Sequence, residues 1–195
     1  MGICIPMITL EWIIGFVWGV GTISDGRFYI RYHNKELLQV IAEVIGTKAR
    51  PYHPTEGKTA LRFSHSNILS QNLLRLGWTG RFDSNRKYPI GLKNELDFIQ
   101  GYCFTKLSYG LRAHKNRKGE IIKTPRIRIY GSYDIVCNID SYLISKLKTT
   151  PKKPALHKTH TQDGYTGECW FVQYQSQKEV PLIMDFIKPI RERQL

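Results

Sequence analysis

Basic and aromatic side chains alternate with apolar residues in two short stretches of the chain, residues 27–32 and 126–130. In a β-strand, such alternation places all the basic and aromatic members on one face. Guanidinium groups donate hydrogen bonds to phosphates and to base edges, and aromatic rings can stack on bases. The pattern therefore predicts a nucleic-acid-binding face in each stretch. Its members are Arg27, Tyr29 and Arg31 in the first stretch and Arg126, Arg128 and Tyr130 in the second.

The charge of the whole chain indicates the same kind of partner. The sequence has 29 Lys and Arg against 16 Asp and Glu, a formal net charge of +13. Residues 1–94 carry 12 basic and 6 acidic residues, and residues 95–195 carry 17 and 10, so both halves share the excess. The stretch from Arg112 to Arg128 alone holds seven basic residues and one acidic residue. We expect a polyanionic partner, with a solvated basic surface as the alternative.

The cysteines and the apolar N-terminal segment indicate the cellular compartment of the protein. Cys4, Cys103, Cys137 and Cys169 form no C-x-x-C pair, which argues against a zinc ribbon or a disulfide framework. We therefore expect an intracellular, reducing compartment such as the cytoplasm or nucleoid. Residues 3–23 are nearly all apolar, but Pro6 and Glu11 interrupt them and no Lys or Arg precedes them. We expect no membrane insertion.

The elements that would position the basic faces follow from the hydrophobic periodicity, which repeats after about eighty-five residues. Each repeat reads αββαββα, so the predicted fold class is α+β, with two pseudo-symmetric repeats that each place helices over a four-stranded antiparallel sheet. The expected domains are residues 1–79 and 94–195, joined by a linker at 80–93. Helices are expected at residues 10–19, 35–46, 67–77, 94–104, 133–147 and 180–190, and strands at 21–32 (a hairpin), 48–52, 59–65, 107–114, 124–131, 153–161 and 169–175.

The two repeats resemble the LAGLIDADG homing endonuclease family in its single-chain, two-repeat form. The first motif copy is "IIGFVWGVG", residues 13–21, and the second is "IQGYCFTKL", residues 99–107. The resemblance covers nearly the whole sequence. It implies that the two motif helices pack against each other through small residues. In this chain those residues are Gly15, Gly19, Gly101 and Thr105.

The resemblance also implies a saddle of two sheets astride a DNA duplex, with paired strands in the major groove. A two-stranded ribbon fits that groove, and alternation directs every second side chain toward the bases and phosphates. The residues expected to bind DNA are Arg27, Tyr29, Arg31, Lys48, Arg50, Arg62, Arg112, His114, Lys115, Arg117, Lys118, Lys123, Arg126, Arg128, Tyr130 and Lys158.

Acidic residues are missing from both motif copies. In the nuclease members of the family, the last acid of each motif helix holds a divalent metal ion at the scissile phosphates. The corresponding residues here are Val20 and Lys106. Valine has no ligand atom and an ammonium group repels the metal ion. We therefore expect no metal, no cofactor and no enzymatic activity. Lys106 is a candidate to replace part of the metal's charge beside a phosphate, unless it is only a solvated lysine at a helix C-terminus.

Three functions remain open on the sequence alone. The first is a sequence-specific double-stranded DNA-binding protein that has lost catalysis, for example a transcriptional regulator. The second is an RNA-binding intron maturase, and the third is an active homing endonuclease with displaced metal ligands. Two repeats in one chain remove the need for a dimer, so we expect a monomer.

Overall fold

The computed structural model describes residues 8–24, 26–51, 59–115, 118–160 and 166–187. By the packing of the chain, residues up to Thr105 form one compact unit and a second unit begins at Lys106. The order of elements is αββαββα twice over, as the sequence predicts. The predicted fold class is confirmed, because both sheets are four-stranded and antiparallel. The repeat boundaries at 1–79 and 94–195, with a linker at 80–93, stay a prediction.

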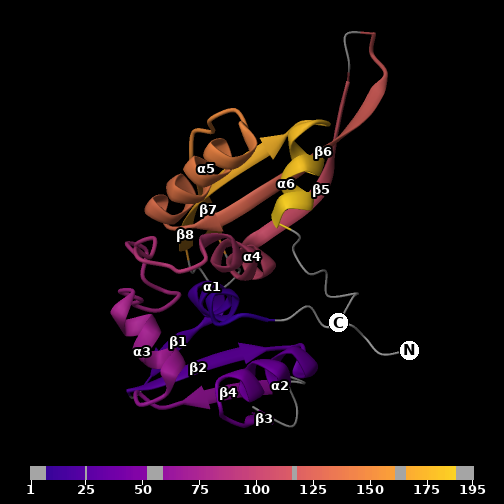
Figure 1. Ribbon diagram of the computed structural model, residues 1–195. Coiled ribbons are helices and arrows are strands. Elements are labelled where there is room, and N and C mark those ends of the chain that lie inside the picture. Colours follow the sequence, from indigo (N-terminus) through magenta and orange to yellow (C-terminus); the bar gives the residue numbers. More distant parts are fainter. Residues whose placement is uncertain (1–7, 25, 52–58, 116–117, 161–165, 188–195) are drawn as a thin grey trace, which may run out of the picture. The chain divides into compact units, whose positions relative to one another are not determined.

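The first unit contains a sheet of strand order β1-β2-β4-β3 (Figure 1). Its helices begin at side-chain caps: the Thr9 hydroxyl accepts from the Trp12 N–H, and the Asn34 side chain accepts from the Leu37 N–H. The elements are α1 (Leu10–Val20), β1 (Thr22–Ser24), β2 (Arg27–Tyr32), α2 (Lys35–Val44), β3 (Ala49–Pro51), β4 (Thr59–Phe63), α3 (Ile68–Arg75) and α4 (Glu95–Lys106), whose last residue opens the second unit.

The second unit repeats the topology with longer strands, in the order β5-β6-β8-β7. Helices α5 and α6 cover one face of this sheet, and the hairpin of β5 and β6 runs on beyond them (Figure 1). The side chains under the helices, among them Ile127, Ile129 and Val172, are fully buried. The elements are β5 (Leu107–Lys115), β6 (Ile121–Gly131), α5 (Tyr133–Leu147), β7 (Ala155–His160), β8 (Thr166–Gln175) and α6 (Glu179–Ile187).

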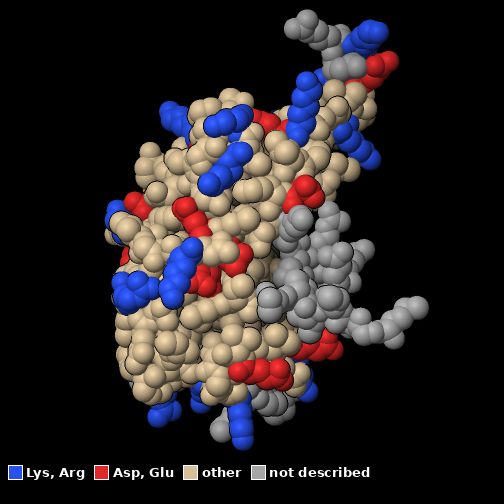
Figure 2. Space-filling view, viewed as in Figure 1, with Lys and Arg blue, Asp and Glu red and all other residues tan. Residues whose placement is uncertain are grey.

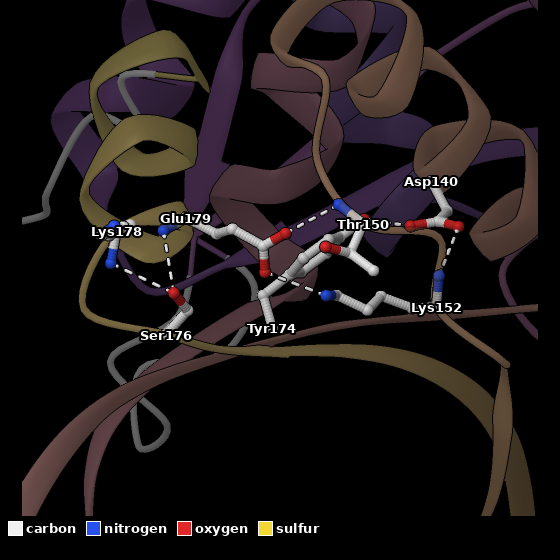
Figure 3. A network of polar contacts seen from close by, with 7 residues as sticks. All are labelled: Asp140, Thr150, Lys152, Tyr174, Ser176, Lys178 and Glu179. Carbon is white, nitrogen blue, oxygen red and sulfur yellow. Dashed lines mark hydrogen bonds and ion pairs between the residues drawn. The ribbon is translucent and has the colours of Figure 1, made fainter.

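A polar network ties α6 to the segment that follows α5 (Figure 3). The Glu179 carboxylate accepts from the Thr150 N–H at 2.7 Å and pairs with the Lys152 ammonium at 2.9 Å. Asp140, which is buried, accepts from the Lys152 N–H at 3.0 Å and from the Tyr174 hydroxyl at 2.5 Å. Partial burial alone would raise the pKa of Glu179, but the bonds from Thr150 and Lys152 outweigh it and hold that pKa below its usual value. The network stabilises the helical layer behind the second sheet.

Candidate nucleic-acid interface

The face of the first sheet that its helices leave uncovered is basic. In β2, Phe28 and Ile30 are fully buried, so alternation places Tyr29 and Arg31 on the opposite face. Arg62 of β4 lies directly across from Tyr29 in the ladder, and its guanidinium carbon lies 5.2 Å from the tyrosine ring centroid. The Arg31 guanidinium lies 6.0 Å from the same ring. Tyr29 is only 9% exposed, so its ring supports the two arginines. We call this surface, comprising Tyr29, Arg31 and Arg62, the first open face.

A third basic side chain belongs to this region, and the sequence did not predict it. Arg81 follows α3, and its N–H donates to the Gly21 carbonyl at 3.0 Å, which holds this segment beside the end of α1. Burial, and then repulsion by the nearby Arg31, lower the pKa of the Arg81 guanidinium. The guanidinium also lies 4.5 Å from the ring centroid of the exposed Phe82. No local pattern marks Arg81, because it lies outside any strand.

The corresponding face of the second sheet joins arginines to glutamines. The buried Ile127 and Ile129 of β6 alternate with Arg126, Arg128 and Tyr130. In β8 the buried Val172 and Tyr174 alternate with side chains on that same face. Ladder pairing brings the two sets together, with Arg128 opposite Gln173, Arg126 opposite Gln175 and Tyr130 opposite Phe171. We call this surface, comprising Arg126, Arg128, Tyr130, Phe171, Gln173 and Gln175, the second open face.

Hydrogen bonds fix two of the arginines on this side of the sheet. Arg128 Nε donates to Gln173 Oε1 at 2.7 Å, and the Arg128 guanidinium carbon lies 4.7 Å from the Phe171 ring centroid. Arg112 of β5 donates from Nη1 to Gln175 Oε1 at 3.1 Å. The arginines were predicted from the sequence, whereas Gln173, Gln175 and Phe171 were not. The alternation in "CWFVQYQ" contained the information, because Val172 and Tyr174 are its apolar members.

The β5–β6 hairpin carries the second open face outward. Its strands pair over nine positions, from Leu107 opposite Ile129 to Lys115 opposite Ile121. Figure 2 shows basic side chains along the projecting part of this hairpin. Arg112 and His114 share the face of Arg126, whereas Lys115 and Lys123 alternate onto the reverse face.

The remaining predicted residues are more scattered. Arg27 is exposed at the start of β2, Lys48 is exposed just before β3, and Lys118 is exposed near the hairpin turn. Lys158 of β7 pairs with Glu168 at 3.0 Å, so a carboxylate already neutralises part of its charge. Arg117 lies outside the described residues, and Arg50 is described only as part of the backbone of β3.

The helices α1 and α4 cross at two glycines. A Cβ added to Gly15 would overlap the Phe98 carbonyl oxygen, and one added to Gly101 would overlap the Trp12 carbonyl oxygen. The contact is reciprocal, so the two backbones touch with no room for a methyl group. Gly19 is buried, while the hydroxyl of Thr105 donates to a carbonyl of its own helix, that of Tyr102, at 3.1 Å.

The two motif positions do not fit a divalent cation. Val20 ends α1 with an aliphatic side chain, and Lys106 ends α4 with an ammonium group. The charge of Lys106 acts on Cys169, although burial dominates there and raises the pKa of the thiol. Among the residues with described placement, no three His, Cys, Asp or Glu side chains gather as a metal site. No helix in the described part of the chain is long and apolar enough to cross a membrane.

Comparison with known proteins rests on structure alone. No family model matches the sequence, and no curated protein matches it either. Solved structures match over most of the chain. The LAGLIDADG meganuclease I-CpaMI bound to uncleaved DNA matches at a TM-score of 0.59 and 14% identity, over 92% of this chain and 84% of that one.

Two further structures give the same result. The I-LtrWI LAGLIDADG homing endonuclease bound to target DNA matches at a TM-score of 0.56 and 12% identity, over 92% of this chain and 83% of that one. The meganuclease I-SmaMI bound to uncleaveable DNA matches at a TM-score of 0.55 and 10% identity, over 94% of this chain and 85% of that one.

These matches contradict the expectation that the chain is not an enzyme, because the structures that share its fold are endonucleases. That expectation rested on Val20 and Lys106, whereas divalent cations accept oxygen ligands from many parts of a chain. Absence of activity therefore does not follow from two positions. What the comparison shows directly is architecture: the chain has the fold of the LAGLIDADG homing endonucleases.

Proposed function

We propose that the protein binds double-stranded DNA with sequence specificity through its two open faces. The observation that carries the proposal is the division of each sheet into a fully buried apolar face and a face of arginines. Phe28 and Ile30 lie behind Arg31 in the first sheet, and Ile127 and Ile129 lie behind Arg128 in the second. Arginines on a rigid sheet can neutralise phosphates and donate to base edges without much further ordering.

The shape of the hairpins favours duplex DNA over duplex RNA. The major groove of B-DNA is wide enough for a two-stranded β-ribbon, whereas the major groove of A-form RNA is too deep and narrow for side chains to read. Two solved structures with this fold are described as bound to uncleaved DNA or to target DNA, which supports the same choice. Binding of a structured RNA, as in an intron maturase, is the alternative that competition with RNA would reveal.

The two units are expected to contact unequal lengths of DNA. Strand β5 has 9 residues and β1 has 3. At about 3.3 Å per residue the β5–β6 ribbon extends about 30 Å, or about nine base pairs, against about 10 Å and three base pairs for β1–β2. We therefore propose an asymmetric site, bound by a monomer, in which the second unit reads the longer part.

Cleavage of the bound duplex is the second candidate function. The observation that favours it is the endonuclease identity of the structures with this fold. Val20 and Lys106 offer no carboxylate, so cleavage would need metal ligands from other positions. We also propose that the Lys106 ammonium contacts a DNA phosphate, at the position where the nuclease members hold an acid.

One experiment separates these functions. The purified chain would select duplexes from a random pool, in parallel with EDTA and with Mg²⁺, and the bound DNA would be sequenced. An enriched sequence in both pools supports specific DNA binding, and no enrichment in either refutes it. Ends that appear only with Mg²⁺ would establish an endonuclease, whereas intact sites in both pools would correspond to a binding protein such as a transcriptional regulator.

A further inference from the structure

Arg128 is held in one orientation before any ligand arrives. Its Nε donates to Gln173 Oε1 at 2.7 Å, and its guanidinium carbon lies 4.7 Å from the Phe171 ring centroid. A hydrogen bond in the guanidinium plane and an aromatic ring beside it restrict the side-chain torsions together. An arginine on a strand surface ordinarily has wide rotamer freedom, which binding would have to remove. Arg128 has lost much of that freedom already.

The supporting glutamine is itself fixed. Gln173 Nε2 lies 3.4 Å from Gln175 Oε1, and the same oxygen accepts from Arg112 Nη1 at 3.1 Å. The direction of this chain of bonds follows from chemistry, because a guanidinium can only donate. Gln173 must turn its oxygen to Arg128, so its amide nitrogen faces the oxygen of Gln175. Each amide in the chain therefore has one orientation.

The groups that Arg128 still offers to a ligand are donors. Gln173 occupies Nε of Arg128, and among the described residues no side chain accepts a hydrogen bond from Nη1 or Nη2 of that arginine. Gln175 has its oxygen occupied twice, which leaves its amide N–H groups. The paired Nη1 and Nη2 donors of Arg128 match a base edge with two adjacent acceptors. In the major groove only guanine has one, at O6 and N7, because adenine places a donor beside N7.

We propose that Arg128 recognises a guanine through bonds from Nη1 and Nη2 to O6 and N7, with Gln173 and Phe171 as its positioning residues. The inference rests on the proposed DNA binding and adds the base that this part of the second open face selects. A bare phosphate would also accept from Arg128, but phosphate contact alone would give no base preference.

The test measures base preference, and not affinity alone. The full-length chain and the variants Arg128→Lys, Gln173→Met and Lys123→Ala would each be profiled against a random duplex pool. Each would then be titrated with the selected duplex, with single-base variants of it, and with an unrelated duplex. Arg128→Lys keeps the charge but loses the paired donors, and Gln173→Met keeps the volume but loses the acceptor. Lys123→Ala is the control, since it removes a charge from the same strand on the reverse face.

For the wild-type protein we expect one guanine whose replacement weakens binding by about ten-fold to a hundred-fold. In Arg128→Lys this preference should vanish, while affinity for the unrelated duplex stays within about two-fold. Gln173→Met should weaken the same preference at the same position, and should add nothing in the Arg128→Lys background. Lys123→Ala should weaken binding to all duplexes alike and leave the preference intact.

Three results would overturn the inference, all separable from failure of DNA binding. One is a wild-type protein that selects a sequence whose guanine preferences survive in Arg128→Lys. Another is a uniform loss of affinity in that variant, which would make Arg128 a phosphate contact. The third is a Gln173→Met effect at a different base, which would make Gln173 a reader in its own right. If the wild-type chain selected no duplex at all, the proposed function itself would be wrong.

Discussion

Substitution of Gly101 by alanine is expected to force two helices apart. The added Cβ would overlap the carbonyl oxygen of Trp12, and it would lie 2.8 Å from the carbonyl carbon of Trp12 and 3.0 Å from the nitrogen of Phe16. Carbon atoms in contact normally lie about 3.5–4.0 Å apart, so the crossing of α1 and α4 would have to widen by about 1 Å. The obstructing atoms belong to the backbone, so no change of rotamer relieves the clash.

The magnitude follows from two opposing effects. Overpacking of a core costs about 1–3 kcal/mol and more where the backbone must move. Alanine regains about 1 kcal/mol of helix propensity relative to glycine. Widening the crossing also loosens buried aromatic contacts between the two helices, such as the edge-to-face pair of Trp18 and Phe98 at 5.7 Å. With about 1 kcal/mol more for the loosened aromatic pair, we expect a net decrease in the free energy of unfolding of about 1–3 kcal/mol.

Urea denaturation followed by tryptophan fluorescence would measure this change. Gly110→Ala is the matched control, because a Cβ at Gly110 meets no atom within 4 Å. The control should remain within about 0.5 kcal/mol of the wild-type protein. Gly15→Ala should lower the free energy of unfolding by a similar amount to Gly101→Ala, since its Cβ would overlap the carbonyl oxygen of Phe98. If Gly101→Ala were as stable as the control, the close backbone contact would be refuted.

Further predictions concern charge. Glu179→Gln should lower the free energy of unfolding by about 1–3 kcal/mol at pH 7, because it removes a carboxylate that holds the Thr150 N–H and the Lys152 ammonium. The lowered pKa of Glu179 means that its contribution is present above the ordinary value of 4.5 and is lost as the pH falls through the folded pKa. The difference between wild type and Glu179→Gln should therefore shrink below about pH 4.5 in acid titrations of urea midpoints, and a constant difference would contradict this. Lys106→Glu should weaken binding of the selected duplex by at least about ten-fold in fluorescence anisotropy, and unchanged affinity would exclude the phosphate contact. The logarithm of the binding constant should fall linearly with the logarithm of salt concentration, with a slope of about −0.9 for each phosphate neutralised; a slope near zero would exclude a phosphate-binding surface.

The order of elements could be predicted from the sequence because local patterns determine it. Alternation in "RFYIRY" and "RIRIY" marked β2 and β6, and buried apolar runs marked α1 and α4. The family resemblance predicted a contact among Gly15, Gly19, Gly101 and Thr105, and the structure brings Gly15 and Gly101 close to the backbone of the facing helix. Only glycine allows the backbone contact found at Gly15 and Gly101.

The parts of the site that sequence reasoning missed depend on pairing between distant segments. The role of Gln173 can be assigned only when the register of the β-ladder is known, because that register places it opposite Arg128. Arg81 is held near the first open face by a backbone hydrogen bond to Gly21. Hydrophobic periodicity in the sequence does not predict this bond. Contact of Tyr29 with DNA stays a prediction, and in the structure its ring lies beside the guanidinium groups of Arg31 and Arg62.

The proposed function requires that the two open faces bind a specific DNA duplex. The most direct test is a competition experiment with the duplex obtained by selection, labelled and bound to the wild-type chain at physiological salt. Unlabelled competitors would be the same duplex, an unrelated duplex and a structured RNA of equal length. We expect the selected duplex to compete at least about a thousand-fold better than either of the others. Equal competition by the unrelated duplex, or stronger competition by the RNA, would contradict it.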